Sequence, residues 1–386
     1  MIKANYPTDK FKDIQTPFYY YDLETLRSTL TEIKTQIENT SFEVHYAMKA
    51  NVNSSVLHEI KIAGLGADCV SGGEVQAALD AGIAPSKIVF AGVGKSDWEI
   101  NLGLDNDIFC FNVESIPELE VMNELAIAKN KTANVALRIN PNVSAHTHHY
   151  ITTGLSENKF GINLSELDKV TDLVLKLSNI NLLGIHFHIG SQITDMTSFQ
   201  DLCLKINEIQ AHFDARNITL KHINVGGGLG ISYEHPNHFP IPDFEAYFKV
   251  FRKHLQLKPT QTLHFELGRA VVAQCGSLIS RVLYVKEGTS KKFAILDAGF
   301  TELIRPALYQ AYHRIENLSS ELPEEEYDVV GPICESSDTF AKEYFMNGTK
   351  RGDIIALRSA GAYGEIMASQ YNLRKLPKAY TSDDLK

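Results

Sequence analysis

The sequence lacks any run of about 20 apolar residues, the length that a helix needs to cross a membrane. Its first 13 residues contain no apolar core, so we do not expect a secretory signal. Clusters of basic residues are also missing, and 47 Asp and Glu outnumber 37 Lys and Arg, which gives a formal net charge of −10 at pH 7. This acidic balance argues against nucleic acid or an anionic membrane as a partner.

Cysteine is scarce, and the five cysteines are scattered, odd in number and without a Cys-x-x-Cys pair. The pattern fits the reducing cytoplasm and argues against a disulfide framework or a zinc knuckle. Cys69, Cys110, Cys203 and Cys275 lie in apolar runs, where we expect them to act as inert fillers. Cys334 differs because it follows a predicted strand and is flanked by Glu335.

The 386 residues suit two domains, or one large barrel with an extension, and 44% hydrophobic with 22% charged residues is ordinary soluble composition. A strand followed by a helix recurs along most of the chain. The predicted strands are 42–48, 67–71, 87–93, 108–113, 134–140, 182–189, 220–225 and 262–267. Seven helices are expected between them, at 55–63, 74–81, 97–104, 117–129, 164–177, 198–216 and 244–255, and another, from Leu23 to Ile37 with Asp22 as its cap, is expected before the first strand.

Eight such units over about 250 residues predict an α/β fold with a (β/α)8 TIM-type barrel. An open doubly wound sheet is the alternative, but it usually has fewer repeats and a glycine fingerprint after its first strand. From residue 276 onward the pattern changes to strands at 278–285, 292–296, 327–333 and 353–358, without long helices. We therefore expect a barrel at 24–272 and a mainly β domain formed by 1–23 and 273–386, with 321–326 as a solvated loop.

The first barrel strand ends in a lysine. Phe42 to Met48 alternates large apolar residues with others, and Lys49 follows at the carboxyl end, on the opposite face. A lysine at a strand tip commonly just reaches water, but partial burial can activate it as a Schiff-base lysine.

Barrel enzymes place their chemistry at this end of the strands. The other strand ends are also polar: Asp68 with Ser71, Asn112, Arg138 with Asn140, His188 with Ser191, Gly226 to Gly228, and Glu266 with Arg269. Asp68 and Ser71 could instead cap helices.

Gly226, Gly227 and Gly228 form either a flexible turn or a set of backbone amides that approach a phosphate, as the loops after strands 7 and 8 often do. The segment matches neither Gly-x-Gly-x-x-Gly nor a P-loop. A lysine, a phosphate cradle and a carboxylate on the last strand together favour pyridoxal 5'-phosphate. Lys49 would hold its aldehyde as an imine, and Glu266 would keep its pyridine nitrogen protonated.

A metal hydrolase is the competing hypothesis. His186 and His188 form a His-x-His pair of a kind that binds metal in some barrels, and His148 with His149 could add ligands. No further histidine falls at a neighbouring strand end, so the pattern favours pyridoxal phosphate over a metal. His188 could then lie on the face of the cofactor ring.

Nine motifs, in order along nearly the whole chain, resemble the alanine-racemase-like barrel class of pyridoxal-phosphate enzymes and, more narrowly, the diaminopimelate decarboxylase family. They are Tyr-Ala-Met-Lys-Ala-Asn (46–51), Val-Ser-Gly-Gly-Glu (70–74), Thr-Gly-Leu with Lys-Phe-Gly (153–161), His-Ile-Gly-Ser-Gln-Ile (188–193), Gly-Gly-Gly-Leu-Gly (226–230), Glu-Leu-Gly-Arg (266–269), Leu-Ile-Arg-Pro-Ala-Leu-Tyr (303–309), Cys-Glu-Ser-Ser-Asp (334–338), and Gly-Ala-Tyr-Gly with Met-Ala-Ser-Gln-Tyr-Asn (361–372). Leu267 stands where the family commonly has proline, and Ser337 where it commonly has glycine.

The resemblance implies decarboxylation of meso-2,6-diaminopimelate to L-lysine, the last step of lysine biosynthesis. It implies these cofactor-binding residues: Lys49, Asp68, His188, Ser191, Gly226, Gly227, Gly228, Glu266, Leu267, Gly268, Arg269 and Tyr363. The implied substrate residues are Arg269, Arg305, Tyr309, Glu335 and Tyr363. Catalytic roles fall to Lys49, His188, Glu266 and Cys334, the last as proton donor. The resemblance also implies a cytoplasmic homodimer in which the Cys-Glu segment reaches the partner's active site, and the β domain contributes to the substrate site and the interface.

Other interpretations stay open. A relative acting on ornithine, arginine or carboxynorspermidine is the closest alternative, although an ornithine enzyme meets no distal carboxylate and should not need two arginines. A non-catalytic pyridoxal-phosphate carrier would resemble the barrel alone. Taken singly, Arg305 and Tyr309 could be a surface ion pair and a half-buried ring. Glu266 favours decarboxylation over racemisation, because a carboxylate holds the ring nitrogen in its charged form whereas an arginine would not.

Overall fold

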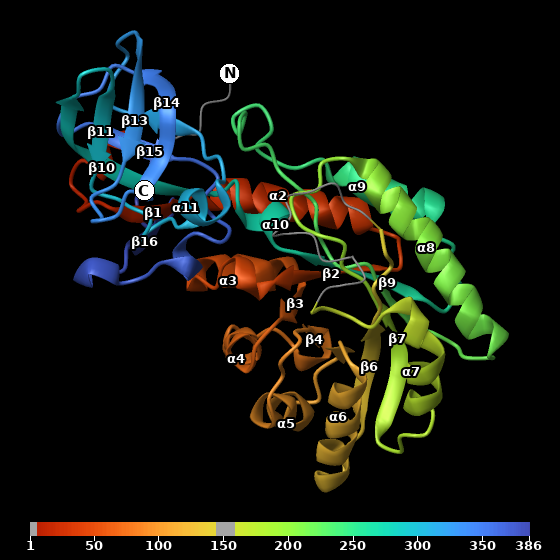
Figure 1. Ribbon diagram of the computed structural model, residues 1–386. Coiled ribbons are helices and arrows are strands. Elements are labelled where there is room, and N and C mark those ends of the chain that lie inside the picture. The colour runs from red at the N-terminus through yellow and green to blue at the C-terminus, as the bar shows by residue number, and fades with distance from the viewer. Residues whose placement is uncertain (1–5, 144–158) are drawn as a thin grey trace. The chain divides into compact units, whose positions relative to one another are not determined.

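The computed structural model describes residues 6–143 and 159–386. The chain divides into two compact units (Figure 1). The barrel unit comprises Leu30–Gly230 and Asp243–Gly268, and the β unit comprises Met1–Thr29, Ile231–Pro242 and Arg269–Lys386. In the described residues, no helix has both the length and the apolar character of a membrane span.

Eight parallel strands close into a barrel in chain order (Figure 1). They are β2 (Phe42–Ala47), β3 (Gly66–Cys69), β4 (Ile88–Phe90), β5 (Cys110–Val113), β6 (Ala133–Arg138), β7 (Ile180–His186), β8 (His222–Asn224) and β9 (Thr262–Leu267). β9 pairs in parallel with β2 and so closes the ring. The predicted (β/α)8 barrel is confirmed, with strand ends that differ by a few residues from the predicted ones.

Helices accompany the barrel strands, and most of them begin at a residue whose side chain caps the first turn. They are α2 (Leu23–Ile37), α3 (Ser54–Ala63), α4 (Gly72–Asp80), α5 (Asp97–Asp105), α6 (Ile116–Ala128), α7 (Leu167–Val174), α8 (Met196–Ala215) and α9 (Phe244–His254). The Ser71 hydroxyl accepts a hydrogen bond from the Glu74 amide at the start of α4, so the capping role considered for Ser71 is confirmed. Gly64, in the left-handed region at φ +80°, ends α3.

Three buried histidines pack together inside the barrel. They are His45 on β2, His222 on β8 and His264 on β9. His45 Nε2 lies 2.9 Å from His264 Nδ1, and the His222 and His264 ring centroids are 4.0 Å apart. Burial lowers the pKa of all three imidazoles, so the fold keeps them neutral.

We expect acid to destabilise the protein through this cluster. Unfolded histidines titrate near pH 6.5, so below that pH the unfolded chain binds more protons than the folded chain. The histidines therefore contribute their full stability above about pH 7, and this stability is lost as pH falls through about 6.5, by up to ~1.4 kcal/mol per group and pH unit. His222→Phe should flatten the dependence of the thermal midpoint on pH between 7 and 5. Exposed His58→Gln is the control, and an equal slope in both variants would contradict the assignment.

A mainly β sheet forms the β unit, as predicted. Its strands are β1 (Phe18–Tyr21), β10 (Gly276–Glu287), β11 (Lys292–Leu296), β12 (Ile315–Asn317), β13 (Glu324–Val330), β14 (Thr339–Asn347), β15 (Ile354–Leu357) and β16 (Lys378–Thr381). The order is β12-β15-β10-β11-β13-β14, and β1 pairs with β10 and β16. Short helices α1 (Thr8–Phe11), α10 (Arg269–Val272) and α11 (Arg305–Tyr309) complete the described part. Phe18, Tyr20 and Ile279 belong to its hydrophobic core.

The prediction of a solvated loop at 321–326 is wrong in its second half. Glu324, Glu325 and Glu326 form the start of β13 and pair with residues 345–347 of β14. Their side chains are exposed, so the sequence carries no apolar alternation there. These residues form a strand because they pair with β14 in the folded protein, and the local sequence does not indicate that pairing. β12, β14 and β16 were not predicted either; β14 has exposed positions that interrupt the alternation, and β12 and β16 are only three and four residues long.

Candidate active site

Lys49 lies one residue past the predicted strand end, in a turn. β2 ends at Ala47, and residues 48–50 form a 3-10 turn. The Tyr46 hydroxyl donates to the Asn51 carbonyl at 2.8 Å, which ties strand and turn together. The Lys49 side chain is 39% exposed, and its Nζ lies 3.6 Å from Asp68 Oδ2. The lysine is thus half-buried, reachable from solvent and next to a carboxylate.

Asp68 on β3 is fully buried, and neither of its carboxylate oxygens has a hydrogen-bond partner among the described residues. Burial raises the pKa of this carboxyl group, the Glu266 carboxylate raises it further, and Lys49 opposes both. Since Ser71 caps α4, Asp68 is not needed as a helix cap. A buried carboxylate that has the Lys49 amine 3.6 Å away but no hydrogen bond among the described residues marks this interior as a place where further polar groups can be accommodated.

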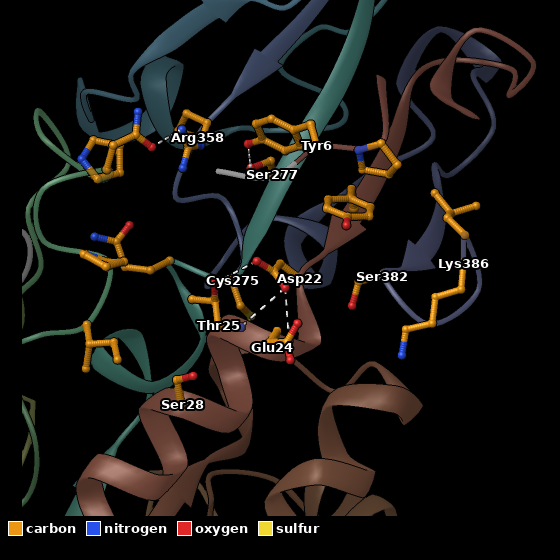
Figure 2. A pocket seen from close by; sticks show the side chains of 18 residues that line it. Tyr6, Asp22, Glu24, Thr25, Ser28, Cys275, Ser277, Arg358, Ser382 and Lys386 are labelled. Atoms are coloured by element: carbon orange, nitrogen blue, oxygen red, sulfur yellow. Dashed lines mark hydrogen bonds between the residues drawn. The ribbon is translucent and has the colours of Figure 1, made fainter. Parts of the chain in front are cut away.

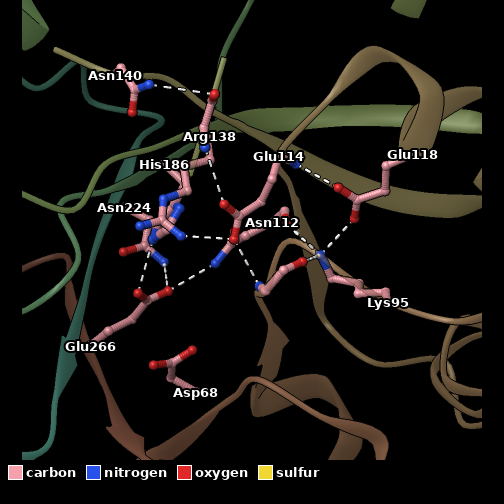
Figure 3. Close-up of polar contacts among 12 residues, drawn as sticks. Asp68, Lys95, Asn112, Glu114, Glu118, Arg138, Asn140, His186, Asn224 and Glu266 are labelled. Carbon is pink, nitrogen blue, oxygen red and sulfur yellow. Dashed lines mark hydrogen bonds and ion pairs between the residues drawn. The ribbon is translucent and has the colours of Figure 1, made fainter. Parts of the chain in front are cut away.

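Glu266 on β9 is buried and receives three hydrogen bonds (Figure 3). Asn112 Nδ2 and Asn224 Nδ2 donate to its Oε1 at 2.9 and 2.8 Å. His186 Nε2 lies 2.9 Å from its Oε2. Burial raises the pKa of Glu266, whereas Lys49 counteracts that shift. The carboxylate is therefore held in place by groups from three other strands.

A second layer of buried charges supports these strand ends. Arg138 Nη1 lies 2.7 Å from Glu114 Oε1, and the same oxygen accepts the Gly92 amide at 2.9 Å. The side chain of Lys95 is almost fully buried, with Nζ 2.6 Å from Glu118 Oε1 and 2.8 Å from the Asn112 carbonyl oxygen. Figure 3 shows the network reaching from Lys95 to Glu266. Each buried charge has an opposite partner, as burial requires.

His188 lies two residues beyond β7 and is half-buried. The Gly227 amide donates to its Nδ1 at 3.3 Å, so the proton of the neutral ring sits on Nε2. Burial lowers the pKa of His188 well below its usual value, and Lys49 lowers it further. Ser191 is half-buried in the following turn.

The proposed His-x-His pair does not act as one unit, because His186 binds Glu266 whereas His188 accepts from Gly227. Among the residues that the structure describes, no three His, Cys, Asp or Glu side chains are grouped to hold a metal. His148 and His149 lie outside the described residues, as does Thr-Gly-Leu (153–155) of the third motif.

The three glycines are required by close backbone packing. A Cβ at Gly226 would lie 2.3 Å from the Phe187 carbonyl oxygen, and one at Gly227 would lie 1.9 Å from the Glu266 carbonyl oxygen. Gly226 and Gly228 also have φ of +68° and +107°, which favour glycine. Their role as a phosphate cradle stays a prediction. The next strand ends in Leu267, which is buried and pairs with Tyr46.

Two buried arginines lie together in the β unit. The guanidinium carbons of Arg269 and Arg305 lie 5.0 and 5.8 Å from the centre of the Tyr363 ring. Arg305 Nε and Nη1 have no hydrogen-bond partner among the described residues, and burial lowers the pKa of this guanidinium. Tyr309 follows Arg305 by four residues on α11, on the same helix face. Unpaired buried donors and two positive charges create a strong preference for an anion.

Tyr233 belongs to this cluster and was not predicted from the sequence. Arg269 Nη1 donates to its hydroxyl, and its ring centre lies 5.9 and 5.5 Å from the guanidinium carbons of Arg269 and Arg305. Tyr233 lies in the segment Ile231–Pro242, which the fold assigns to the β unit although barrel residues flank it on both sides. No local periodicity signals such an exchange between units.

Cys334 and Glu335 lie on the exposed segment between β13 and β14. The Cys334 amide donates to Asn372 Oδ1 at 3.2 Å, and the Tyr371 hydroxyl donates to Glu335 Oε1 at 2.8 Å. The other four cysteines are buried. Cys334 is therefore the cysteine whose thiol is open to solvent in this chain.

The β unit also contains a cavity of about 500 Å³ (Figure 2). Asp22, Thr25, Cys275, Arg358 and Lys386 are among its lining residues. Arg358 is already paired with Glu316 at 2.8 Å. None of the predicted site residues lines this cavity, so it is separate from the arginine and tyrosine cluster.

Comparison with known proteins agrees with this geometry. The family model described as "Pyridoxal-dependent decarboxylase, pyridoxal binding domain" matches residues 23–273. The chain is 65% identical over 385 residues to the diaminopimelate decarboxylase of Bacteroides thetaiotaomicron, covering 100% of both proteins. The crystal structure of the Helicobacter pylori diaminopimelate decarboxylase complexed with L-lysine superimposes with a TM-score of 0.91, at 40% identity, over 97% of this chain and 93% of that one.

The chain belongs to the diaminopimelate decarboxylase family. Like other members of this family, it is an enzyme that uses pyridoxal 5'-phosphate for decarboxylation. A lysine decarboxylase from Selenomonas ruminantium has a TM-score of 0.85 at 19% identity, covering 100% of this chain and 98% of that one, which shows the shared fold alone.

The residues present fit the cofactor of the diaminopimelate decarboxylase family. Glu266 offers a buried carboxylate fixed by three donors, and Asp68 offers two buried oxygens that lack hydrogen-bond partners among the described residues. Lys49 provides an accessible amine next to Asp68. The two departures from the family pattern are tolerated, because Leu267 continues the β9 ladder and Ser337 lies on an exposed segment.

Proposed function

We propose that the enzyme decarboxylates meso-2,6-diaminopimelate to L-lysine and carbon dioxide, the last step of lysine biosynthesis. The observation that carries the substrate assignment is the buried pair Arg269 and Arg305. Both guanidinium groups lie over the Tyr363 ring, and Nε and Nη1 of Arg305 have no hydrogen-bond acceptor among the described residues. Such a pair suits a carboxylate through paired, charge-assisted hydrogen bonds. Diaminopimelate has a distal carboxylate, whereas ornithine does not.

Lys49 would hold the cofactor through its aldehyde, and Glu266 would accept a hydrogen bond from its pyridine nitrogen. Asp68 stabilises the positive charge of the Lys49 amine. The residues proposed for the phosphate and the ring face are Ser191, Gly226, Gly227, Gly228, Leu267, Gly268 and His188, with Arg269 and Tyr363 completing the cofactor site. The bound cofactor supplies an acceptor for the electron pair that the departing carboxyl group leaves behind.

Substrate recognition falls to side chains of the β unit. Arg305, Arg269, Tyr309 and Tyr363 take the distal carboxylate, and Glu335 takes the distal ammonium. The family-model match over 23–273 supports a cofactor-binding domain at 24–272, with 1–23 and 273–386 as the second domain.

The Cys334 thiol delivers a proton to the substrate carbon. Because Cys334 and Glu335 are exposed in this chain, we propose that they complete the active site of a partner subunit in a cytoplasmic homodimer. The absence of a cysteine pair near Cys334 in the sequence is consistent with a free thiol in a reducing compartment.

Cys334→Ala should lower turnover by about 100-fold, the range typical of a lost general acid, while cofactor affinity changes little. The measurements are kcat with meso-diaminopimelate and the dissociation constant of the cofactor from absorbance titration. Ser337→Ala, on the same exposed segment, is the control. Full activity of Cys334→Ala would exclude this residue as the proton donor.

The function is tested by carbon dioxide release from meso-diaminopimelate, L-lysine, L-ornithine, L-arginine and carboxynorspermidine, with identification of each product. We expect release from meso-diaminopimelate alone, with L-lysine as product. A visible spectrum before and after addition of substrate reports cofactor engagement in the same sample. Faster release from ornithine or arginine would replace the substrate assignment, and a colourless, metal-dependent enzyme would overturn the cofactor assignment.

A further inference from the structure

The carboxylate of Glu266 is almost fully supplied with donors from the protein itself. Its Oε1 accepts two amide N–H groups, from Asn112 and Asn224, and its Oε2 accepts one N–H from His186. A carboxylate oxygen accepts two hydrogen bonds readily. Among the residues that the structure describes, Oε2 therefore has room for one more donor, and the two hydrogen bonds to Oε1 fix the orientation of the carboxylate.

All three donors are neutral. Burial, followed by the charge of Arg138, holds the pKa of His186 well below its usual value, so the ring carries one proton. That proton lies on Nε2, because Nε2 faces the carboxylate and Nδ1 has no partner among the described residues. Neutral donors stabilise a carboxylate without cancelling its negative charge, so the field of Glu266 stays available to a positively charged neighbour.

The charged and titratable groups that face Glu266 come from several strands. Lys49 after β2 and Arg138 on β6 favour its ionised form, whereas Asp68 on β3 opposes it. His45 on β2 and Cys110 on β5 also interact electrostatically with Glu266. Lys49 is shared with Asp68 and partly exposed, so it does not compensate Glu266 alone.

The two asparagines are themselves fixed. Asn224 Oδ1 accepts the Gly226 amide at 2.9 Å, which leaves its Nδ2 facing Glu266. The Asn112 carbonyl oxygen accepts from the buried Lys95 ammonium at 2.8 Å, and Lys95 is held by Glu118. The Gly226 amide thus orients the side chain of Asn224, whereas Lys95 holds the backbone of Asn112 (Figure 3).

We propose that Asn112, Asn224 and His186 are positioning residues that keep Glu266 ionised and aimed as the acceptor for the cofactor's pyridine nitrogen. The proposal rests on the proposed function of Glu266. It assigns a task to residues that lie on three different strands and donate to Glu266. It also explains why a buried carboxylate here needs no salt-bridging arginine of its own.

The test removes one donor at a time from the holoenzyme. Asn112→Leu keeps approximate size and removes the amide, and its Oδ1 has no partner to lose among the described residues. His186→Phe removes the imidazole donor, and His186→Gln restores a neutral donor. Asn181→Leu is the matched control, since Asn181 is an exposed amide on barrel strand β7 that bonds to Asn134.

Loss of a donor raises the pKa of Glu266, so the acid limb of the kcat profile should move to higher pH, by about one unit for each neutral donor. The cofactor dissociation constant should rise about ten-fold, with KM nearly unchanged. His186→Gln should return both values toward wild type, and Asn181→Leu should match wild type. If Asn112→Leu does not fold, comparison of His186→Phe with His186→Gln decides the question.

Glu266→Gln separates this inference from the function on which it rests. If Glu266→Gln keeps wild-type turnover, the proposed role of Glu266 itself is wrong. If Glu266→Gln is inactive but Asn112→Leu and His186→Phe keep the wild-type acid limb and cofactor affinity, only the positioning role is overturned. The positioning role is supported if the acid limb of the kcat profile moves to higher pH in both Asn112→Leu and His186→Phe and returns toward wild type in His186→Gln.

Discussion

Lys49→Ala is expected to reduce turnover by at least about 1,000-fold, because the variant loses a covalent attachment and an acid–base group together. The purified variant should lack the visible absorbance of a lysine-bound cofactor. Borohydride should fix no cofactor to it, whereas wild type should be labelled at Lys49. The physical basis is the position of the amine, which is half-buried and 3.6 Å from the Asp68 carboxylate.

Lys87→Ala is the matched control for this experiment. Lys87 is exposed and precedes β4, at the opposite end of the barrel strands from Lys49, and its Nζ contacts only the Gly64 carbonyl among the hydrogen bonds described. The control should keep wild-type colour, labelling and turnover. If Lys49→Ala is also coloured and active, the nucleophile lies elsewhere and the cofactor assignment of the strand end fails.

Arg305→Ala is expected to cause the second large loss of activity. Removing one partner of a buried charge-assisted pair costs about 2–5 kcal/mol, or roughly 30- to several-thousand-fold, so kcat/KM for meso-diaminopimelate should fall within that range. Cofactor affinity should not change. Any slow release of carbon dioxide from L-lysine should be unaffected or increased, because L-lysine has no distal carboxylate.

Two further variants make the Arg305 result specific. Arg305→Lys keeps the charge but loses the planar pair of donors, so it should recover only part of the lost kcat/KM. Arg351→Ala removes an exposed arginine of the same unit, which stacks 4.9 Å from the Tyr284 ring centre, and should match wild type. An unchanged ratio of activities on the two substrates in Arg305→Ala would remove Arg305 from the specificity site.

Much of the fold could be predicted because the barrel repeat is local. Each β/α unit carries its own apolar alternation and its own helix face, and Thr262–Leu267 was placed at its observed bounds. β14 was missed because its exposed positions break the alternation, and β13 was predicted three residues late because its first three residues are glutamates. Those strands form because β13 pairs with β11 and β14, and such hydrogen bonds between strands leave no trace in the apolar pattern of either strand.

Some residues of the candidate site could likewise be predicted from local sequence, and others could not. Lys49, Asp68 and Glu266 were recognisable because polar residues at strand ends stand out against apolar strands. Tyr233 was not, since it acts from a loop and touches residues far along the chain. Spacing alone left the histidine pair open as an alternative metal pair, because it cannot tell that His186 faces Glu266 while His188 faces Gly227.

The sequence by itself determined the barrel, the lysine at the end of its first strand and the family, because these follow from periodic patterns and contiguous motifs. Only the tertiary structure decided which polar groups share a hydrogen bond. Asn112, Asn224, His186 and Glu266 come from four strands, and their distances are set by barrel closure rather than by any spacing along the chain. Closure brings neutral donors onto one buried carboxylate, and that arrangement sets its direction and its charge.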